Sequence, residues 1–222
     1  EMCIRDRITS CNNQDICWVE GLLSTIYDVF LDQIVDGQIY TKGTGERDPS
    51  REHWTRLHEL NLAQNALLVF DRGYYSKELY EDLVSDGCHV LMRLNKGNHL
   101  TRLGSDDFSW TAASADGKPV LYRIVRVPLP EQSNEEAEYL VTNITDPSIS
   151  PALLYNLYFE RWNIETKYRE LKEWWELEEF TGTSCNSIEQ ELYINLLFSN
   201  LAALVKTEAD LSLIHISEPT RR

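Results

Sequence analysis

The chain has 222 residues, of which 42% are hydrophobic and 10% aromatic, so its length and composition predict one large domain with a hydrophobic core. No apolar run approaches the roughly 20 residues that span a bilayer, which argues against a membrane protein. The formal net charge of −15 argues against a simple nucleic-acid binder, whose surface is usually basic, but permits an enzyme that touches DNA through a local patch.

Residues 21–41 predict a β-hairpin, because two runs rich in branched and aromatic residues, LLSTIYDVF and IVDGQIYT, are separated by a short polar link. A glycine-containing loop follows. Ser50 is then expected to cap a helix over residues 51–60.

The run LLVFD at residues 67–71 is short and continuously apolar up to its last residue, as expected for a strand buried on both faces. Ser76 is expected to cap a helix over residues 77–86, and Gly87 suits the stop of that helix. Residues 89–94 predict another strand. This order of strands and helices is typical of an α/β layered domain.

Residues 97–148 contain turn signals between short strands, such as those at 119–129 and 138–144, and are expected to form a β-rich insertion. Ser150 and Pro151 then predict the cap and first turn of a long helix that runs to about residue 178. The apolar stripe expected along this helix consists of Leu154, Leu157, Ile164, Tyr168, Leu171 and Trp175.

The last predicted helix begins near Ser187, which forms a possible capping box with Gln190. Residues 188–206 of this helix are strongly apolar, so we expect the helix to be buried.

Four polar residues of the long helix, Tyr158, Arg161, Glu165 and Lys172, fall within about 60° of arc at 100° per residue. One helix face would therefore carry a phenol, a guanidinium, a carboxylate and an ammonium. The alternative is a solvated face with i,i+4 pairs such as Arg161 with Glu165, and the helix by itself favours that alternative.

Asp71 ends the LLVF strand, at the edge where open α/β sheets gather their functional residues. Phosphodiester chemistry often uses two metal ions about 4 Å apart, held by carboxylates because Mg²⁺ prefers oxygen ligands. Asp71 and Glu165 are the candidate ligands, with Arg161 and Lys172 on phosphate oxygens and Tyr158 on a phosphate or a base. The alternative for Asp71 is an ordinary turn cap.

The string DRGYYS, together with the spacing of Tyr158, Arg161, Glu165 and Lys172, resembles the transposases of bacterial insertion-sequence family four. The resemblance covers roughly residues 20–206 and includes the strings LMRL, YLVTNI and EEFTG. It implies an α/β fold with a ribonuclease-H-like mixed sheet, flanking helices and a β-rich insertion.

The resemblance also implies a DDE recombinase that cuts transposon ends and joins the freed 3′-hydroxyl to target DNA with two Mg²⁺ or Mn²⁺ ions. Asp71 would be the second metal-binding aspartate and Glu165 the third carboxylate. Tyr158, Arg161 and Lys172 would position the phosphates of the transposon ends. Double-stranded DNA is the implied partner, and the intact protein would be a homodimer.

The first aspartate of the family's pattern has no counterpart in this sequence. Neither Asp6 nor Asp15 is followed by glycine. Asp28 corresponds to the next strand of the family's pattern, after the strand that carries the first aspartate. We therefore expect a core truncated on its N-terminal side and a chain inactive in DNA cleavage. Two alternatives stay open: a metal-dependent nuclease of the same fold without strand transfer, and a non-catalytic DNA-binding remnant.

The terminal strings EMCIRDR and LSLIHISEPTRR resemble translated sequencing-adapter read-through, so the ends are expected to be non-native. The expected segments are 1–7 and 211–222 as these ends, 8–96 and 149–210 as the two parts of the catalytic core, and 97–148 as the insertion.

Five cysteines without a CxxC pair predict reduced thiols. The expected location is the bacterial cytoplasm, at the nucleoid during function.

Overall fold

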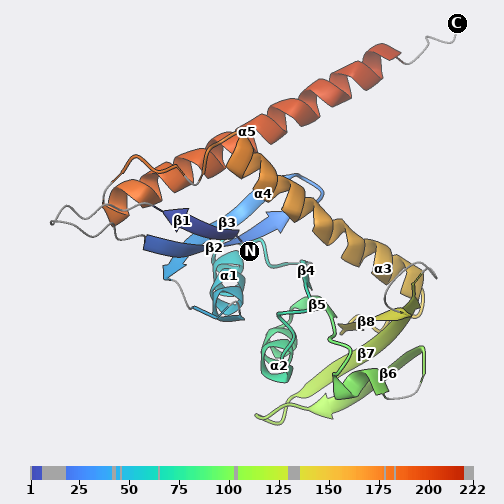
Figure 1. Cartoon of the computed structure of the whole chain (residues 1–222). Coiled ribbons are helices and arrows are strands. Elements are labelled where there is room, and N and C mark those ends of the chain that lie inside the picture. The colour runs from blue at the N-terminus through green and yellow to red at the C-terminus, as the bar shows by residue number, and fades with distance from the viewer. Residues whose placement is uncertain are drawn as a thin grey trace, which may run out of the picture. The chain divides into compact units, whose positions relative to one another are not determined.

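The structure is a computed structural model that describes residues 2–6, 19–41, 44–45, 47–64, 66–102, 105–129, 136–177, 179–182 and 184–217, with side chains at all of these except 2–6, 19–21, 41 and 211–217. The chain forms two compact units, the first from residues 1–44 and 163–222 and the second from residues 45–162. We call them the hairpin unit and the sheet unit. Figure 1 labels the α-helices and β-strands of both.

The hairpin unit contains an antiparallel sheet in the order β1-β2-β3. Its elements are β1 (Met2–Asp6), β2 (Val19–Asp28), β3 (Gln33–Thr41), α4 (Asn163–Glu173) and α5 (Cys185–Ser217). The hairpin predicted at residues 21–41 is confirmed. Its turn is closed by Asp28, whose Oδ1 accepts hydrogen bonds from the backbone N–H groups of Phe30 and Leu31.

The core of the hairpin unit lies between the hairpin and the two helices. It consists of Leu23, Ile34, Tyr168, Leu171, Leu177, Leu192 and Leu196. Gly37 of β3 lets α5 approach closely, since a Cβ added there would lie 2.8 Å from Leu196 Cδ1. The helix that carries Glu165 is therefore fixed to the hairpin by apolar packing.

The sheet unit contains a five-stranded mixed sheet in the order β4-β5-β8-β7-β6, in which only the β4–β5 pair is parallel. Its strands are β4 (Leu67–Phe70), β5 (His89–Arg93), β6 (Asp107–Ala113), β7 (Pro119–Pro128) and β8 (Ala137–Thr142), and its helices are α1 (Arg47–Glu59), α2 (Lys77–Ser85), η1 (His99–Arg102), α3 (Pro151–Phe159) and η2 (Glu160–Trp162).

Helices cover both faces of this sheet. Tyr80 of α2 stacks on Tyr122 of β7, whereas Leu154 and Tyr158 of α3 pack with Val125 of the same strand and with Leu91. Residues 122 and 125 point to opposite faces because side chains alternate along a strand. The α/β class with a mixed sheet and flanking helices is therefore confirmed.

Several local predictions are also confirmed. The strands expected near 67–71, 89–94, 119–129 and 138–144 are β4, β5, β7 and β8. Ser76 caps α2 by accepting from the N–H of Leu79, and Gly87 follows that helix with φ of +86°. Ser150 caps α3 in the same way, with Pro151 in its first turn.

Two predictions about helix starts are wrong. Helix α1 begins at Arg47, so Ser50 lies inside it and is buried. Helix α5 begins earlier than expected, and its reciprocal capping bonds join Ser184 and Ser187, each hydroxyl accepting from the other's backbone N–H. Gln190 takes no part in these bonds.

The predicted continuous helix from Pro151 to residue 178 is wrong as well. It consists of α3, the 3-10 turn η2 and α4, and it ends at Glu173. Glu176 has φ of +47°, which a continuing α-helix does not allow. Because a 3-10 turn advances by 120° per residue, the arc worked out from 100° per residue does not hold across η2.

Two predictions of burial need correction. β4 is the edge strand of its sheet, and all four of its residues are half-buried, so it is not enclosed on both faces. Helix α5 is buried on one side only, and several large apolar side chains on its other side are exposed.

The predicted division of the core by an insertion at residues 97–148 stays a prediction. Strands β6, β7 and β8 of that segment belong to the same sheet as β4 and β5. In the part of the chain that the structure describes, no helix has both the length and the apolar character to cross a membrane.

Candidate active site

Asp71 directly follows β4, at its carboxyl end. The loop behind it turns back through a hydrogen bond from the N–H of Tyr74 to the carbonyl of Asp71. The carboxylate is half-buried, with 44% of the side chain exposed. This position leaves it open to solvent on one side and in contact with protein on the other.

The structure brings two of the predicted site residues to this carboxylate. The hydroxyl of Tyr158, at the end of α3, donates a hydrogen bond of 2.8 Å to Asp71 Oδ1. Arg161 Nη2, in η2, lies 4.0 Å from Asp71 Oδ2, and its guanidinium lies over the rings of Tyr158 and Trp162. Asp71 and the first half of the Tyr-Arg-Glu-Lys motif therefore form one cluster within the sheet unit.

These contacts set the charge of the site. Burial by itself would raise the pKa of Asp71, but the backbone N–H of Arg72, the Tyr158 hydroxyl and the nearby arginines outweigh it and lower that pKa. Burial and the bond to a carboxylate raise the pKa of Tyr158 to about 12. At neutral pH Asp71 is an anion and Tyr158 a neutral donor.

The ring of Tyr158 is 2% exposed and packs in the core beneath the sheet. Its hydroxyl proton is engaged by Asp71. The predicted contact of Tyr158 with a DNA phosphate or base stays a prediction, and the structure supplies a second role, that of holding Asp71.

Glu165 and Lys172 lie in the hairpin unit, on exposed positions of α4. Two polar contacts fix the rotation of this helix against the hairpin: Tyr168 OH lies 2.6 Å from Thr25 Oγ1, and Lys167 Nζ lies 3.4 Å from Asp32 Oδ1. The meeting of Glu165 with Asp71 stays a prediction.

Sequence reasoning missed Arg93, which ends β5. In the parallel register Phe70 of β4 is opposite Met92, so Asp71 and Arg93 are the next pair. Arg93 contributes to the lowered pKa of Asp71 and forms an ion pair of 2.7 Å with Glu138. Since parallel strands place their carboxyl ends together, the strings LLVFD and HVLMR contained this signal.

Arg47 was missed as well, and no local pattern marks it. Its guanidinium donates to three consecutive carbonyls of the loop after Asp71, those of Gly73, Tyr74 and Tyr75. A planar guanidinium can serve several acceptors at once. Arg47 therefore holds in place the loop of residues 73–75, which follows Asp71.

The groups around Asp71 meet only some of the requirements of a divalent-cation site. An ionised, half-exposed carboxylate is the oxygen ligand that such cations prefer. Among the described residues, however, no group of three or more His, Cys, Asp or Glu side chains is gathered as a metal site would require. Cys88 is buried and Cys185 exposed, and both are free thiols.

Residues 10–201 match the family described as the transposase DDE domain. The chain belongs to this family. Its members generally use divalent metal ions. The match spans the Asp71 cluster and α4. It therefore supports the predicted fold class independently of the structure.

A curated relative supports the same assignment. The transposase InsG for insertion sequence element IS4, from Escherichia coli strain K12, is 29% identical to the chain over 154 residues. These residues make up 62% of the chain and 34% of the relative, so the matched part of this transposase domain covers about a third of that protein. The predicted place in insertion-sequence family four is confirmed.

Proposed function

We propose that the chain is part of the catalytic domain of a DNA transposase that cuts transposon ends and joins the freed 3′-hydroxyl to target DNA. The observation that carries this proposal is the bond from Tyr158 to Asp71, with Arg161 beside it. It joins a strand-end carboxylate to the motif of a distant helix, 87 residues along the chain.

The proposed ligands of a divalent ion, Mg²⁺ or Mn²⁺, are Asp71 and Glu165. Such ions, when bound, activate the attacking oxygen and stabilise the leaving oxygen of a phosphodiester. Tyr158 keeps Asp71 oriented with its charge intact. Arg161 and Lys172 would bind DNA phosphates, Arg161 in a forked geometry and Lys172 as a point charge.

The proposed reaction has two balanced steps. Water attacks the phosphodiester at the transposon end, so that one P–O bond forms, another breaks and a 3′-hydroxyl is released. That hydroxyl then attacks a target phosphodiester, and the target's own 3′-hydroxyl leaves. The 222-residue chain contains no Asp-Gly-Ser or Asp-Gly-Thr motif, so we propose that it performs neither step by itself.

The test uses the intact transposase that contains this sequence, with labelled transposon-end DNA and Mg²⁺ or Mn²⁺. Asp71→Asn and Glu165→Gln should each reduce end cleavage by more than ~100-fold, since even outer-shell changes at metal sites cost 10- to 100-fold. The matched control is Glu173→Gln, an exposed carboxylate of the same helix, which should keep its activity.

Product analysis separates the alternatives. Joining of a 3′-hydroxyl end to target DNA supports a transposase, whereas cleavage without joining indicates a nuclease of the same fold. Full activity of Glu165→Gln would contradict the proposed catalytic role, whereas DNA binding without cleavage by the unsubstituted protein would favour a non-catalytic remnant. Cleavage by the isolated 222-residue chain, abolished by Asp71→Ala, would contradict its proposed inactivity.

A further inference from the structure

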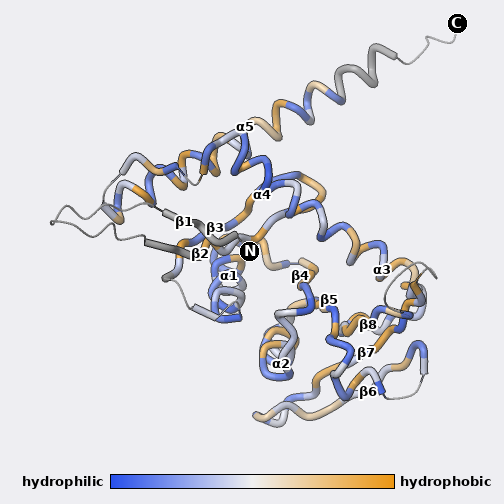
Figure 2. Tube along the Cα trace, viewed as in Figure 1, coloured by the Kyte–Doolittle hydropathy of each residue, from blue (hydrophilic) through white to orange (hydrophobic). Residues whose placement is uncertain are grey.

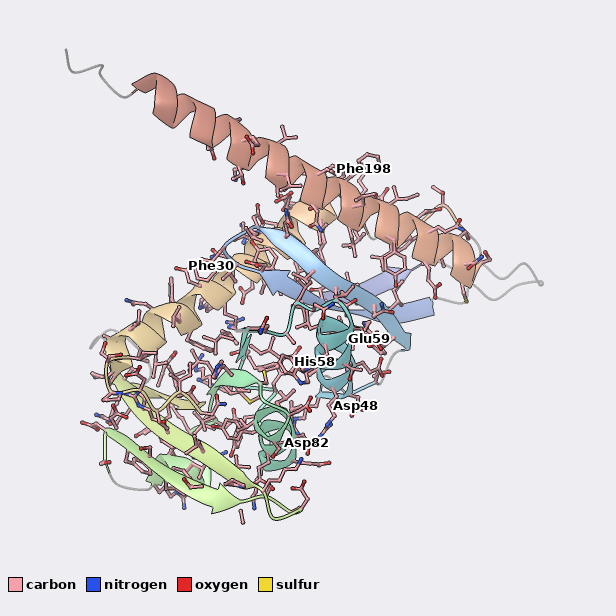
Figure 3. The ribbon with its side chains drawn as sticks, turned by 180° about the vertical axis from the view of Figure 1, so that it is seen from behind. Phe30, Asp48, His58, Glu59, Asp82 and Phe198 are labelled. Atoms are coloured by element: carbon pink, nitrogen blue, oxygen red, sulfur yellow. The ribbon has the colours of Figure 1, made fainter. Side chains whose placement is uncertain are left out.

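Glu138 of β8 forms an ion pair with Arg93 that is largely hidden from solvent. Arg93 Nη2 lies 2.7 Å from Glu138 Oε1, and the two side chains are only 17% and 12% exposed. The pair of Arg51 with Asp82, a residue that Figure 3 labels on α2, is of the ordinary exposed kind, with 36% and 52% exposure. Because charges are costly to desolvate, stability alone does not account for a buried pair at this place.

The pair lies on the face of the sheet that carries Tyr158. Arg93 is opposite Leu140 in the antiparallel pairing of β5 with β8, and Glu138 is two residues from Leu140. Opposite residues, and residues two apart in a strand, point to the same face. Leu140 packs in one cluster with Tyr158, and Figure 2 shows hydrophobic residues in β7 and β8. The two charges are therefore on the side from which Tyr158 reaches Asp71.

Arg93 also lies next to Asp71. Because Phe70 is opposite Met92 in the parallel register, Asp71 and Arg93 are the next pair at the carboxyl ends of β4 and β5. Adjacent strands lie about 4.8 Å apart, which an arginine side chain can span. The charge of Arg93 acts on Asp71. Asp71 nevertheless has its ion pair with Arg161, at 4.0 Å, whereas Arg93 has its own with Glu138.

We propose that Glu138 is a positioning residue that keeps the Arg93 guanidinium off Asp71, so that the Asp71 carboxylate stays open to a divalent cation. This inference rests on the proposed function, in which Asp71 is a ligand of that cation. A guanidinium and a divalent cation compete for one carboxylate, because both are positive and both bind its oxygens. Glu138 removes this competition by holding Arg93 at 2.7 Å.

The balance of charge around Asp71 shows what the loss of Glu138 would do. Two guanidiniums, those of Arg93 and Arg161, are matched by the carboxylates of Asp71 and Glu138. Glu138→Gln leaves Arg93 without its anionic partner, and a buried charge that has lost its partner is strongly unfavourable. Asp71, at the end of the adjacent strand, is a carboxylate that Arg93 can reach. Arg93 would then bind Asp71 and occupy the oxygens that the cation needs.

The first test needs no metal and uses the 222-residue chain. Asp71→Asn is made in three backgrounds: the parent, Glu138→Gln, and Glu138→Gln with Arg93→Gln. Urea denaturation gives the factor by which Asp71→Asn lowers the folding equilibrium constant in each background. This factor should be at least ~3 times larger in Glu138→Gln than in the parent, because Asp71 has become the partner of Arg93. It should return to the parent value once Arg93 is substituted too.

Equal factors in the parent and in Glu138→Gln would overturn the proposal, as would a larger factor that persists without Arg93. Circular dichroism of each variant checks that the fold is intact. Glu138→Met, which has a similar volume and also removes the charge, is measured in parallel, so that the comparison does not depend on one substitution.

The second test measures the consequence for the metal. Mn²⁺ binding is followed by electron paramagnetic resonance in the intact transposase that contains this sequence, on pre-cleaved transposon-end DNA. Glu138→Gln should raise the half-saturating Mn²⁺ concentration at least ~10-fold, the size of outer-shell effects at metal sites. Adding Arg93→Gln should reverse most of this loss. The matched control is Glu136→Gln, an exposed carboxylate two residues before Glu138, which should bind Mn²⁺ like the parent.

Unchanged Mn²⁺ affinity in Glu138→Gln, or a loss that Arg93→Gln does not reverse, would refute the proposed role of Glu138. Mn²⁺ binding that Asp71→Asn leaves unchanged would instead contradict the proposed function, because Asp71 would then not be a ligand. In that case the first test still decides whether Glu138 controls the position of Arg93, since it involves no metal.

Discussion

The bond between Tyr158 and Asp71 can be tested by removing a single oxygen. Tyr158→Phe keeps the aromatic ring in the core with Leu154 and Val125 but removes the hydroxyl that donates to Asp71. The substitution creates no large cavity, so its effect isolates the hydrogen bond.

The magnitude follows from the charge and exposure of the acceptor. Hydrogen bonds to charged groups are worth about 1.5–3 kcal/mol when buried. Because 44% of the Asp71 side chain is exposed, water replaces part of the lost bond and screens its charge. We therefore expect Tyr158→Phe to lower the free energy of unfolding by about 1 kcal/mol at pH 7.

The assay is a double-mutant cycle by urea denaturation with Asp71→Ala as the second change. The coupling between Tyr158 and Asp71 should be about 0.5–1 kcal/mol, since the bond is lost whichever partner is removed. Tyr155→Phe, a half-buried tyrosine of the same helix, is the control and should show coupling to Asp71 below about 0.3 kcal/mol. Equal coupling for both tyrosines would refute the reasoning.

The stabilisation that Asp71 contributes should decrease as the pH falls. The pKa of Asp71 is lowered in the folded state, so the unfolded state binds the proton more readily. The stabilisation is present above the ordinary aspartate pKa of about 3.9 and is lost as the pH falls through the lower folded pKa. The difference between the parent and Tyr158→Phe should therefore shrink on acidification.

Three further predictions concern the surroundings of the site and the cap of α5. Arg47→Met should speed hydrogen–deuterium exchange in the loop after Asp71 by about tenfold, because the loop loses its contacts to the guanidinium. Unchanged exchange would show that the loop keeps its conformation without Arg47. Gly182→Ala should lower the free energy of unfolding by about 1 kcal/mol, measured by urea denaturation, since its Cβ would displace Ser187 from the cap. Native alkylation read by mass spectrometry should modify exposed Cys185 but spare Cys88, because burial raises the pKa of that thiol to about 12; equal labelling without urea would contradict this burial.

Local signals were enough for many elements of the fold. Ser76 and Ser150 predicted helix starts, because a hydroxyl caps the N–H of a residue only three positions away. Gly87 predicted a helix stop through its own backbone freedom. Each of these effects depends on neighbours in the chain, which the sequence states directly.

The same reasoning failed for the start of α1 and for the length of the helix that begins at Pro151. Ser50 is a good cap residue, but α1 begins three residues earlier, so Ser50 lies inside that helix, where it is buried. The helix after Pro151 kept its apolar stripe but divided at η2, so its first part packs in the sheet unit and its second in the hairpin unit.

The sequence by itself determined that Asp71 ends a strand and that Tyr158 lies on a helix, with Arg161 three residues further along the chain. Only the tertiary structure decided that these groups meet, because a bond across 87 residues depends on the order of strands in the sheet. It alone showed that Arg47 of α1 binds the loop after Asp71 and that one side of α5 is exposed. Covalent neighbours are fixed by the chain, whereas charge, burial and contact at a site are set by segments that folding brings together.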